Sequence, residues 1–84
     1  ADLEKLREKS LLREFDDYLK ELEGNKKKLR TFRTEAIRAG FKNAYKEKDF
    51  ETIVKVGYRI PEKVIQEDDK LFMFYENAKI RLGL

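Results

Sequence analysis

The hydrophobic residues in the first quarter of the chain recur at the spacing of an α-helix. Four apolar residues follow one another at intervals of three or four: Leu12, Phe15, Leu19 and Leu22. This spacing places their side chains on one face of a helix, with charged residues on the other faces. Gly24 is well suited to close the helix, because glycine adopts the left-handed C-terminal conformation without a steric penalty. We therefore predict a helix over residues 2–23.

A second helical pattern covers residues 26–47. Its apolar and small residues share one broad arc of a helical wheel: Leu29, Phe32, Ala36, Ile37, Gly40 and Ala44. A glycine inside a helix costs about 1 kcal/mol relative to alanine, so Gly40 needs a compensating role. Together with Ala36 and Ala44 it forms a seam of small residues. We expect another helix to approach closely at this seam.

Capping residues and a proline divide the following stretch. Asp49 is a typical N-cap residue, and we predict a third helix over residues 50–58. Pro61 biases the residue before it away from the helical region and breaks the chain there. Proline is favoured at the first position of a helix, so a short helical turn is expected to run from Pro61 to about Gln66.

The last helix is predicted over residues 70–82, after the acidic pair Asp68 and Asp69. Acidic residues at a helix start interact favourably with the positive end of the helix dipole. Its main apolar stripe contains Leu71, Phe74, Tyr75, Ala78 and Leu82. Further apolar residues, Phe72, Met73 and Ile80, fall on other faces. A helix that is apolar nearly all round is buried or forms an interface.

Small and aromatic residues alternate along part of the second helix and lead into a turn. The series reads Ala36-Ile37, Gly40-Phe41, Ala44-Tyr45 and then Asp49-Phe50. Over roughly residues 36–83 the chain resembles the helical hairpins of tetratricopeptide repeats (TPR), in which such a series is followed by a Gly/Asp–Phe/Tyr turn and a closing proline. The chain departs from that pattern because Pro61 comes early and because Gly57 stands where a larger residue is usual. The resemblance implies scaffolding or peptide binding rather than catalysis.

These patterns predict an all-α fold, either a four-helix bundle or a helical-repeat (TPR-like) fragment, with the third helix broken at Pro61. Residues 1–84 are expected to form a single helical domain that is a module of a longer protein. The predicted core consists of Leu12, Phe15, Leu19, Leu22, Leu29, Phe32, Ile37, Phe41, Ile53, Val56, Leu71, Phe74, Ala78 and Leu82.

The amino-acid composition excludes several classes of function. The chain has 84 residues, of which 44% are charged, and it contains neither cysteine nor histidine. Disulfides, thiolate nucleophiles, zinc fingers and imidazole acid–base chemistry are therefore excluded. No spacing of carboxylates, tyrosines or lysines argues for an active site, so we predict a non-enzymatic protein without cofactor, metal or small-molecule substrate. The lack of cysteine, of a signal peptide and of a long apolar run favours a cytoplasmic location.

The net charge of +3 conceals an uneven distribution. Residues 1–25 carry a net charge of −3, residues 26–48 carry +7, and residues 49–84 carry −1. Cations and aromatic rings interleave on the basic second helix: Lys27, Arg30, Arg38, Phe41, Lys42, Tyr45 and Lys46. Such a face suits nucleic acid or an acidic partner. In the alternative interpretation, the two aromatic rings pack against the third helix and the cations face water.

Two functions follow from these features. The first is protein–protein interaction or scaffolding, with another protein or a second copy bound through four apolar residues near the end of the chain: Phe72, Met73, Ile80 and Leu84. The alternative is an accessory nucleic-acid-binding domain that uses the basic residues of 26–48. In both cases no membrane contact is expected.

Overall fold

The computed structural model describes residues 2–24, 29 and 31–84 of the chain. Within them the chain forms helices and no strand, as the hydrophobic pattern predicts. The helices are α1 (Asp2–Glu23), α2 (Thr34–Lys46), α3 (Phe50–Gly57), α4 (Glu62–Glu67) and α5 (Asp69–Arg81). The all-α class and the break at Pro61 are confirmed.

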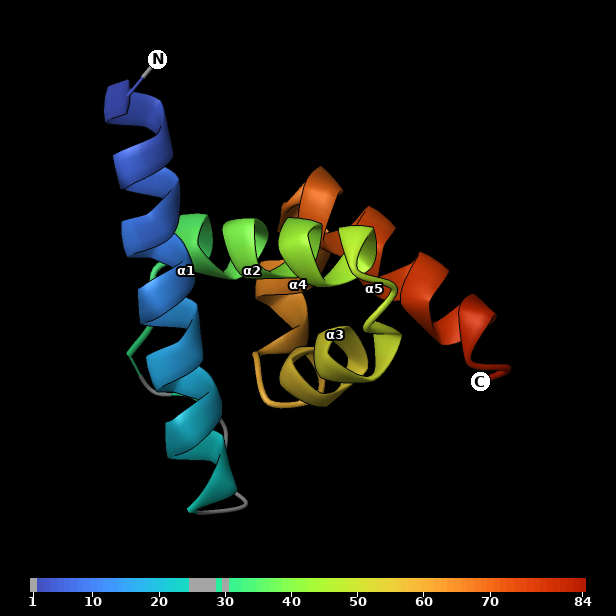
Figure 1. The fold of residues 1–84 in the computed structure, drawn as a ribbon. Helices are drawn as coiled ribbons and strands as arrows, with labels where there is room; N and C mark the ends of the chain where they lie inside the picture. The colour runs from blue at the N-terminus through green and yellow to red at the C-terminus, as the bar shows by residue number, and fades with distance from the viewer. Residues whose placement is uncertain (1, 25–28, 30) are drawn as a thin grey trace.

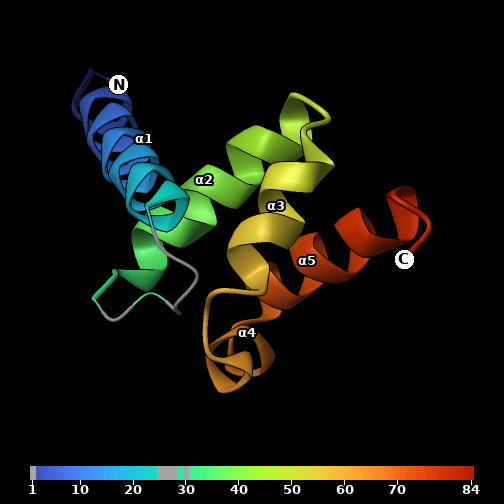
Figure 2. The ribbon, with the colours of Figure 1, turned by 90° about the horizontal axis from the view of Figure 1, so that it is seen from below.

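Helix α2 is the centre of the arrangement (Figures 1 and 2). On one side it packs against α1, and on the other against α3 and α5. Helix α4 packs against the first turns of α5. The N-terminal turns of α1 project beyond α2, and the end of α5 projects on the opposite side (Figure 1). Leu3 and Leu6, on the projecting turns of α1, are exposed.

The core joins all five helices. Its buried hydrophobic residues are Phe15, Tyr18, Leu22, Leu29, Ala36, Ile37, Phe41, Ala44, Ile53, Val54, Val56, Ile60, Ile65, Leu71 and Ala78. Nine of them belong to the predicted core. Four other predicted core residues are only half-buried: Leu12, Leu19, Phe32 and Phe74. The prediction was wrong for Leu82, which is 37% exposed because it caps the projecting end of α5.

The predicted start of the second helix is also wrong. Helix α2 begins at Thr34 instead of residue 26, and the predicted helical residues 26–28 and 30 lie outside the described residues. The buried Leu29 instead donates its backbone N–H to the carbonyl of Arg59, at 2.8 Å. The backbone N–H of Arg33, which is extended, donates to the Tyr18 hydroxyl at 2.9 Å. These long-range hydrogen bonds replace the helical ones that the local pattern favours.

The small-residue seam brings α1 against α2, which confirms the expected close approach. Gly40 lies beneath the ring of Phe15, so that a Cβ on Gly40 would be 2.2 Å from the nearest ring carbon. Phe15 in turn meets the ring of Phe41 edge to face, with 6.2 Å between ring centroids. Ala36 and Ala44 are buried on either side.

Side-chain hydrogen bonds cap the N-terminal ends of α3 and α5, as predicted. Asp49 accepts hydrogen bonds from the backbone N–H and the hydroxyl of Thr52, at 3.3 and 2.7 Å. Asp68 accepts from the N–H groups of Lys70 and Leu71, both at 3.1 Å. The three bonds from backbone N–H groups satisfy donors that the first turn of a helix leaves free.

Candidate protein-interaction site

The four residues predicted to bind a partner are all exposed. Phe72 and Met73 are each 47% exposed, and Ile80 is 71% exposed. Because Met73 and Ile80 are seven residues apart and Phe72 is eight from Ile80, the three side chains fall on one face of α5. We call this the α5 outer face. Leu84 is 69% exposed and lies past the helix end, where its backbone N–H bonds to the carbonyl of Lys79 at 2.9 Å.

A groove lies along each side of this face. Phe72 borders a groove of about 340 Å³, whose apolar walls also contain Tyr58, Ile60, Ile65 and Tyr75. We call it the α4–α5 groove. Met73 borders a groove of about 320 Å³ that also contains Leu11, Glu35, Arg38, Ala39, Lys42, Lys70 and Phe74. We call it the α2–α5 groove. The α5 outer face is therefore a ridge between two hollows.

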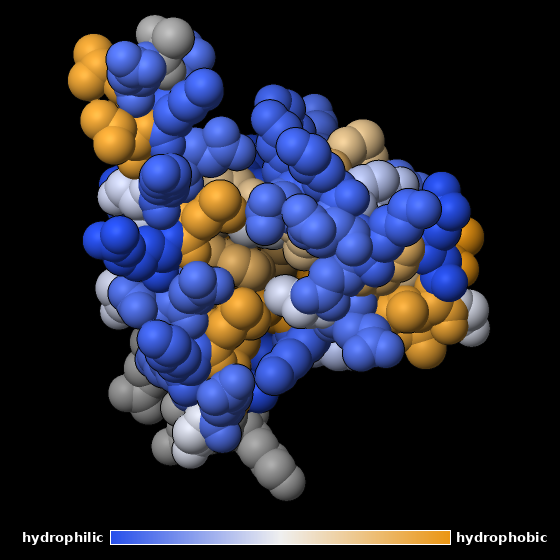
Figure 3. Space-filling model, in the orientation of Figure 1, coloured by the Kyte–Doolittle hydropathy of each residue, from blue (hydrophilic) through white to orange (hydrophobic). Residues whose placement is uncertain are grey.

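A third hollow lies between α1 and α2. It has a volume of about 270 Å³, and its apolar wall contains the half-buried Leu12 and Leu19. Figure 3 shows apolar side chains gathered in the space beside α1. Acidic and amide groups, among them Asp16 and Asp49, form the other wall. This opening explains why two predicted core leucines are not fully covered.

Gly57 and the ring of Tyr75 lie in close contact in the wall of the α4–α5 groove. A Cβ on Gly57 would lie 2.3 Å from a ring carbon of Tyr75. Tyr75 meets Tyr58 edge to face at 6.1 Å, and the Lys79 ammonium lies 4.7 Å from the centroid of the Tyr75 ring. Burial raises the pKa of the Tyr75 hydroxyl. Lys79 also forms an ion pair with Glu76 at 2.7 Å.

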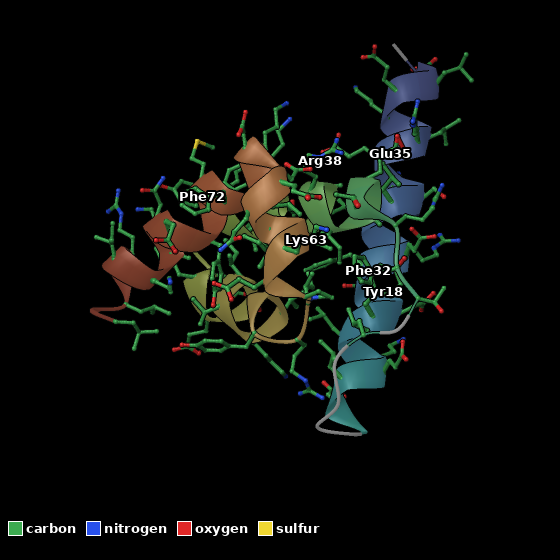
Figure 4. All side chains as sticks on the ribbon, turned by 180° about the vertical axis from the view of Figure 1, so that it is seen from behind. Tyr18, Phe32, Glu35, Arg38, Lys63 and Phe72 are labelled. Atoms are coloured by element: carbon green, nitrogen blue, oxygen red, sulfur yellow. The ribbon has the colours of Figure 1, made fainter. Side chains whose placement is uncertain are left out.

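The charged groups of the α2–α5 groove are only partly neutralised. Arg38 forms an ion pair with Asp68 at 3.0 Å, and Glu35 forms one with Arg7 of α1. Figure 4 shows Glu35 and Arg38 on α2, seen from behind. Lys42 and Lys70 are exposed, and in the described part of the chain neither has an ion-pair partner.

The carboxyl group of Asp68 links the groove to the start of α5. Partial burial alone would raise its pKa, but the amide of Leu71, the guanidinium of Arg38 and the amide of Lys70 outweigh that effect. The net result is a pKa below the ordinary value of 3.8. Hydrogen bonds to the charged form and a nearby cation both favour ionisation.

Replacing Asp68 with asparagine is expected to make the free energy of unfolding depend less steeply on pH in the acid range. A carboxyl whose pKa is lower in the folded state stabilises the fold above its unfolded pKa. That contribution is lost as the pH falls through the folded pKa. The free energy of unfolding should therefore fall less steeply below about pH 5 in Asp68→Asn than in the parent. Urea denaturation followed by circular dichroism across pH values measures this.

Asparagine also caps helices well, so the substitution removes the charge and keeps the cap. The exposed neighbour provides the control, because Asp69→Asn removes the same charge without breaking the Arg38–Asp68 ion pair, so it should change the slope by less than Asp68→Asn. Equal slopes for Asp68→Asn and the parent would contradict the lowered pKa of Asp68.

The basic face predicted on the second helix does not form as expected. Phe41 is fully buried, so the prediction that it stacks with nucleotide bases is wrong. Tyr45 is half-buried and packs against Phe50 and Phe74, with ring centroids 5.4 and 5.5 Å away. The alternative interpretation, in which both rings pack against the third helix, is confirmed for Tyr45, which contacts Phe50 of α3, whereas the buried Phe41 contacts Phe15 of α1.

The predicted cations of that face have different surroundings. Lys27 and Arg30 lie outside the described residues. Arg38 is engaged with Asp68, whereas Lys42 and Lys46 are exposed. A helical wheel placed both aromatic rings at the boundary of the basic face, and it could not show that other helices cover them.

Sequence reasoning missed the contribution of Lys70 to the groove. Lys70 precedes Met73 and Phe74 by three and four residues, so its place beside them could be read from helical periodicity. Its position across from Lys42 could not, because that depends on how α5 packs against α2.

No protein-family model matches the chain, and no curated protein or solved structure matches it. None of the helices in the described residues has the length and apolar character that crossing a membrane requires.

Proposed function

We propose that this protein is a non-enzymatic interaction module that binds another protein through the α5 outer face. The observation that carries the proposal is the exposure of Phe72, Met73 and Ile80 on one face of a helix whose opposite face is in the core. Removing apolar surface from water contributes about 25 cal/mol of favourable free energy per Å². A complex in which a partner covers this ridge is therefore stabilised.

The surroundings of the ridge support the same proposal. Phenylalanine and methionine are enriched at protein interfaces, and grooves on both sides of a ridge offer pockets for partner side chains. The resemblance to tetratricopeptide hairpins over residues 36–83 adds a scaffolding role to the proposal. An intracellular location belongs to it as well, since a chain without cysteine suits a reducing compartment.

Position-specific photo-crosslinking tests the proposal. A benzophenone amino acid is placed at Ile80 on the α5 outer face, and at the exposed Lys55 on α3 as the matched control. Sedimentation velocity over a range of concentrations measures self-association in parallel. We expect one defined adduct, with another protein or a second copy, from position 80 and none from position 55.

A chain that stays monomeric in sedimentation and gives no adduct specific to position 80 would contradict the proposal. Adducts of equal yield from both positions would contradict it as well, because they indicate non-specific contact. Binding to nucleic acid is the remaining alternative, supported by the exposed Lys42 and Lys46. It predicts a gel shift with single-stranded oligonucleotides that weakens steeply as salt is added.

A further inference from the structure

Helices α2 and α5 run side by side in the same direction along the α2–α5 groove. Arg38 contacts Asp68 near one end, and Tyr45 contacts Phe74 farther along. The two contacts are separated by seven residues of α2 and six of α5, which correspond to about 10 and 9 Å of helix. Figures 1 and 2 show both helices running in the same general direction, with α5 inclined to α2.

This register places the two unpaired lysines opposite each other. Lys42 lies between Arg38 and Tyr45 on α2, and Lys70 lies between Asp68 and Phe74 on α5. Both residues line the groove, one on each wall. Two cationic residues without ion-pair partners among the described residues thus border the same hollow from opposite walls.

The space between the two lysines is apolar. Leu11 from α1, Ala39 from α2, and Met73 and Phe74 from α5 line it. Of these, Met73 is the most accessible, at 47% exposed, and Phe74 is half-buried. The cation of Arg38 and the carboxylate of Glu35 already have partners, so the unpaired charge of the lining is positive.

The stripe of α2 that borders the groove extends from Glu35 to Lys42, which is two helical turns or about 10 Å. Two parallel helices with an apolar hollow between them present the surface onto which a third helix packs. The structure therefore suits a short helix with one apolar stripe.

We propose that the α2–α5 groove binds an acidic amphipathic helix of another protein. Its apolar stripe covers Met73 and Phe74, and its carboxylates pair with Lys42 and Lys70. This inference rests on the proposed function and names the class of partner. The charge of the lysines selects acidic segments over basic ones, and the apolar floor selects an amphipathic helix over a fully polar chain.

The α4–α5 groove provides an internal comparison. It contains Glu62 and Glu76 with Lys79, and Lys79 is already paired with Glu76. The unpaired charge of the α4–α5 groove is therefore negative, so an acidic partner should bind the α2–α5 groove in preference to it. Phe72 and Met73 are adjacent and equally exposed, but each borders a different groove.

Fluorescence anisotropy with designed peptides tests the inference on the whole 84-residue chain. The probe is a labelled amphipathic peptide of about 18 residues, with leucine and phenylalanine on one face and glutamate beside them. A version with lysine in place of glutamate and a scrambled version serve as comparison probes. We expect the chain to bind the glutamate peptide and to bind the other two at least about tenfold more weakly.

Charge reversal in the groove gives the second readout. The double variant Lys42→Glu/Lys70→Glu should bind the glutamate peptide about tenfold more weakly and should gain affinity for the lysine peptide. The control Lys55→Glu/Lys63→Glu makes the same charge change at exposed positions of α3 and α4, and it should bind like the parent. Met73→Glu should abolish binding, whereas Phe72→Glu, on the side of the ridge that borders the other groove, should weaken it by less. Circular dichroism shows that each variant is folded.

Several outcomes would overturn the inference. One is equal affinity for the glutamate and lysine peptides. Others are a Lys42→Glu/Lys70→Glu variant that binds like the parent, and stronger losses from Phe72→Glu than from Met73→Glu. Displacement of the peptide by a single-stranded oligonucleotide at lower concentration would assign the lysines to nucleic acid instead. If the peptides fail while position 80 still yields its adduct, the proposed function stands and only the partner class is wrong.

Discussion

Replacing Phe41 with alanine is expected to lower the free energy of unfolding by about 3–5 kcal/mol. Phe41 is fully buried and is the largest of the completely buried side chains in the described residues. Truncation removes the transfer free energy of the ring and leaves a cavity that the surrounding core fills only in part. The edge-to-face contact with Phe15 is lost as well. Urea denaturation followed by circular dichroism measures the change.

The loss is large compared with the roughly 5–15 kcal/mol that stabilises a typical domain, so Phe41→Ala is expected to be partly unfolded at 37 °C. Phe72→Ala removes the same ring from a half-exposed position and should change stability by less than about 1 kcal/mol. Similar losses for the two variants would contradict the burial of Phe41. They would also reopen the interpretation in which Phe41 is displayed for stacking.

Most of the fold could be predicted from local features of the sequence. The bounds of α1 and the cap at Asp49 follow from helical periodicity and from side-chain chemistry that acts within a few residues. The start of α2 could not be predicted in this way. Leu29 has helical periodicity with Phe32, but its N–H bonds to Arg59, which is thirty residues away in sequence.

In the candidate site, too, only the features that depend on local sequence could be predicted. The exposure of Phe72, Met73 and Ile80 was predictable, because a last helix with apolar residues on several faces cannot bury them all in a small bundle. The α2–α5 groove was not predictable, because it requires Lys42 and Lys70 to meet across two helices. Their positions follow from the packing of Tyr45 on Phe74, which no local pattern reports.

Replacing Gly40 with alanine is expected to be the most damaging of the conservative substitutions in α2. An added methyl group would lie 2.2–2.4 Å from three carbons of the Phe15 ring, far inside van der Waals contact. Alanine favours a helix by about 1 kcal/mol over glycine, but overpacking costs about 1–3 kcal/mol and sometimes more. We expect a net loss of about 2 kcal/mol, because the ring is buried and cannot move outward without opening the core.

The same clash predicts a coupling between the two positions, measured by a double-mutant cycle with urea denaturation. Phe15→Ala removes the three ring carbons that the added methyl group would meet, so Gly40→Ala should cost less in that background than in the parent. Gly24→Ala is the control, since among the described residues its added methyl group would meet no atom closer than 3.7 Å. Additive losses in the cycle would show that the damage does not come from the Phe15 ring. A cost that disappears with Phe15→Ala instead locates the close contact of α1 and α2 at this one pair. Through this contact α1 then holds Leu11 in place beside the α2–α5 groove.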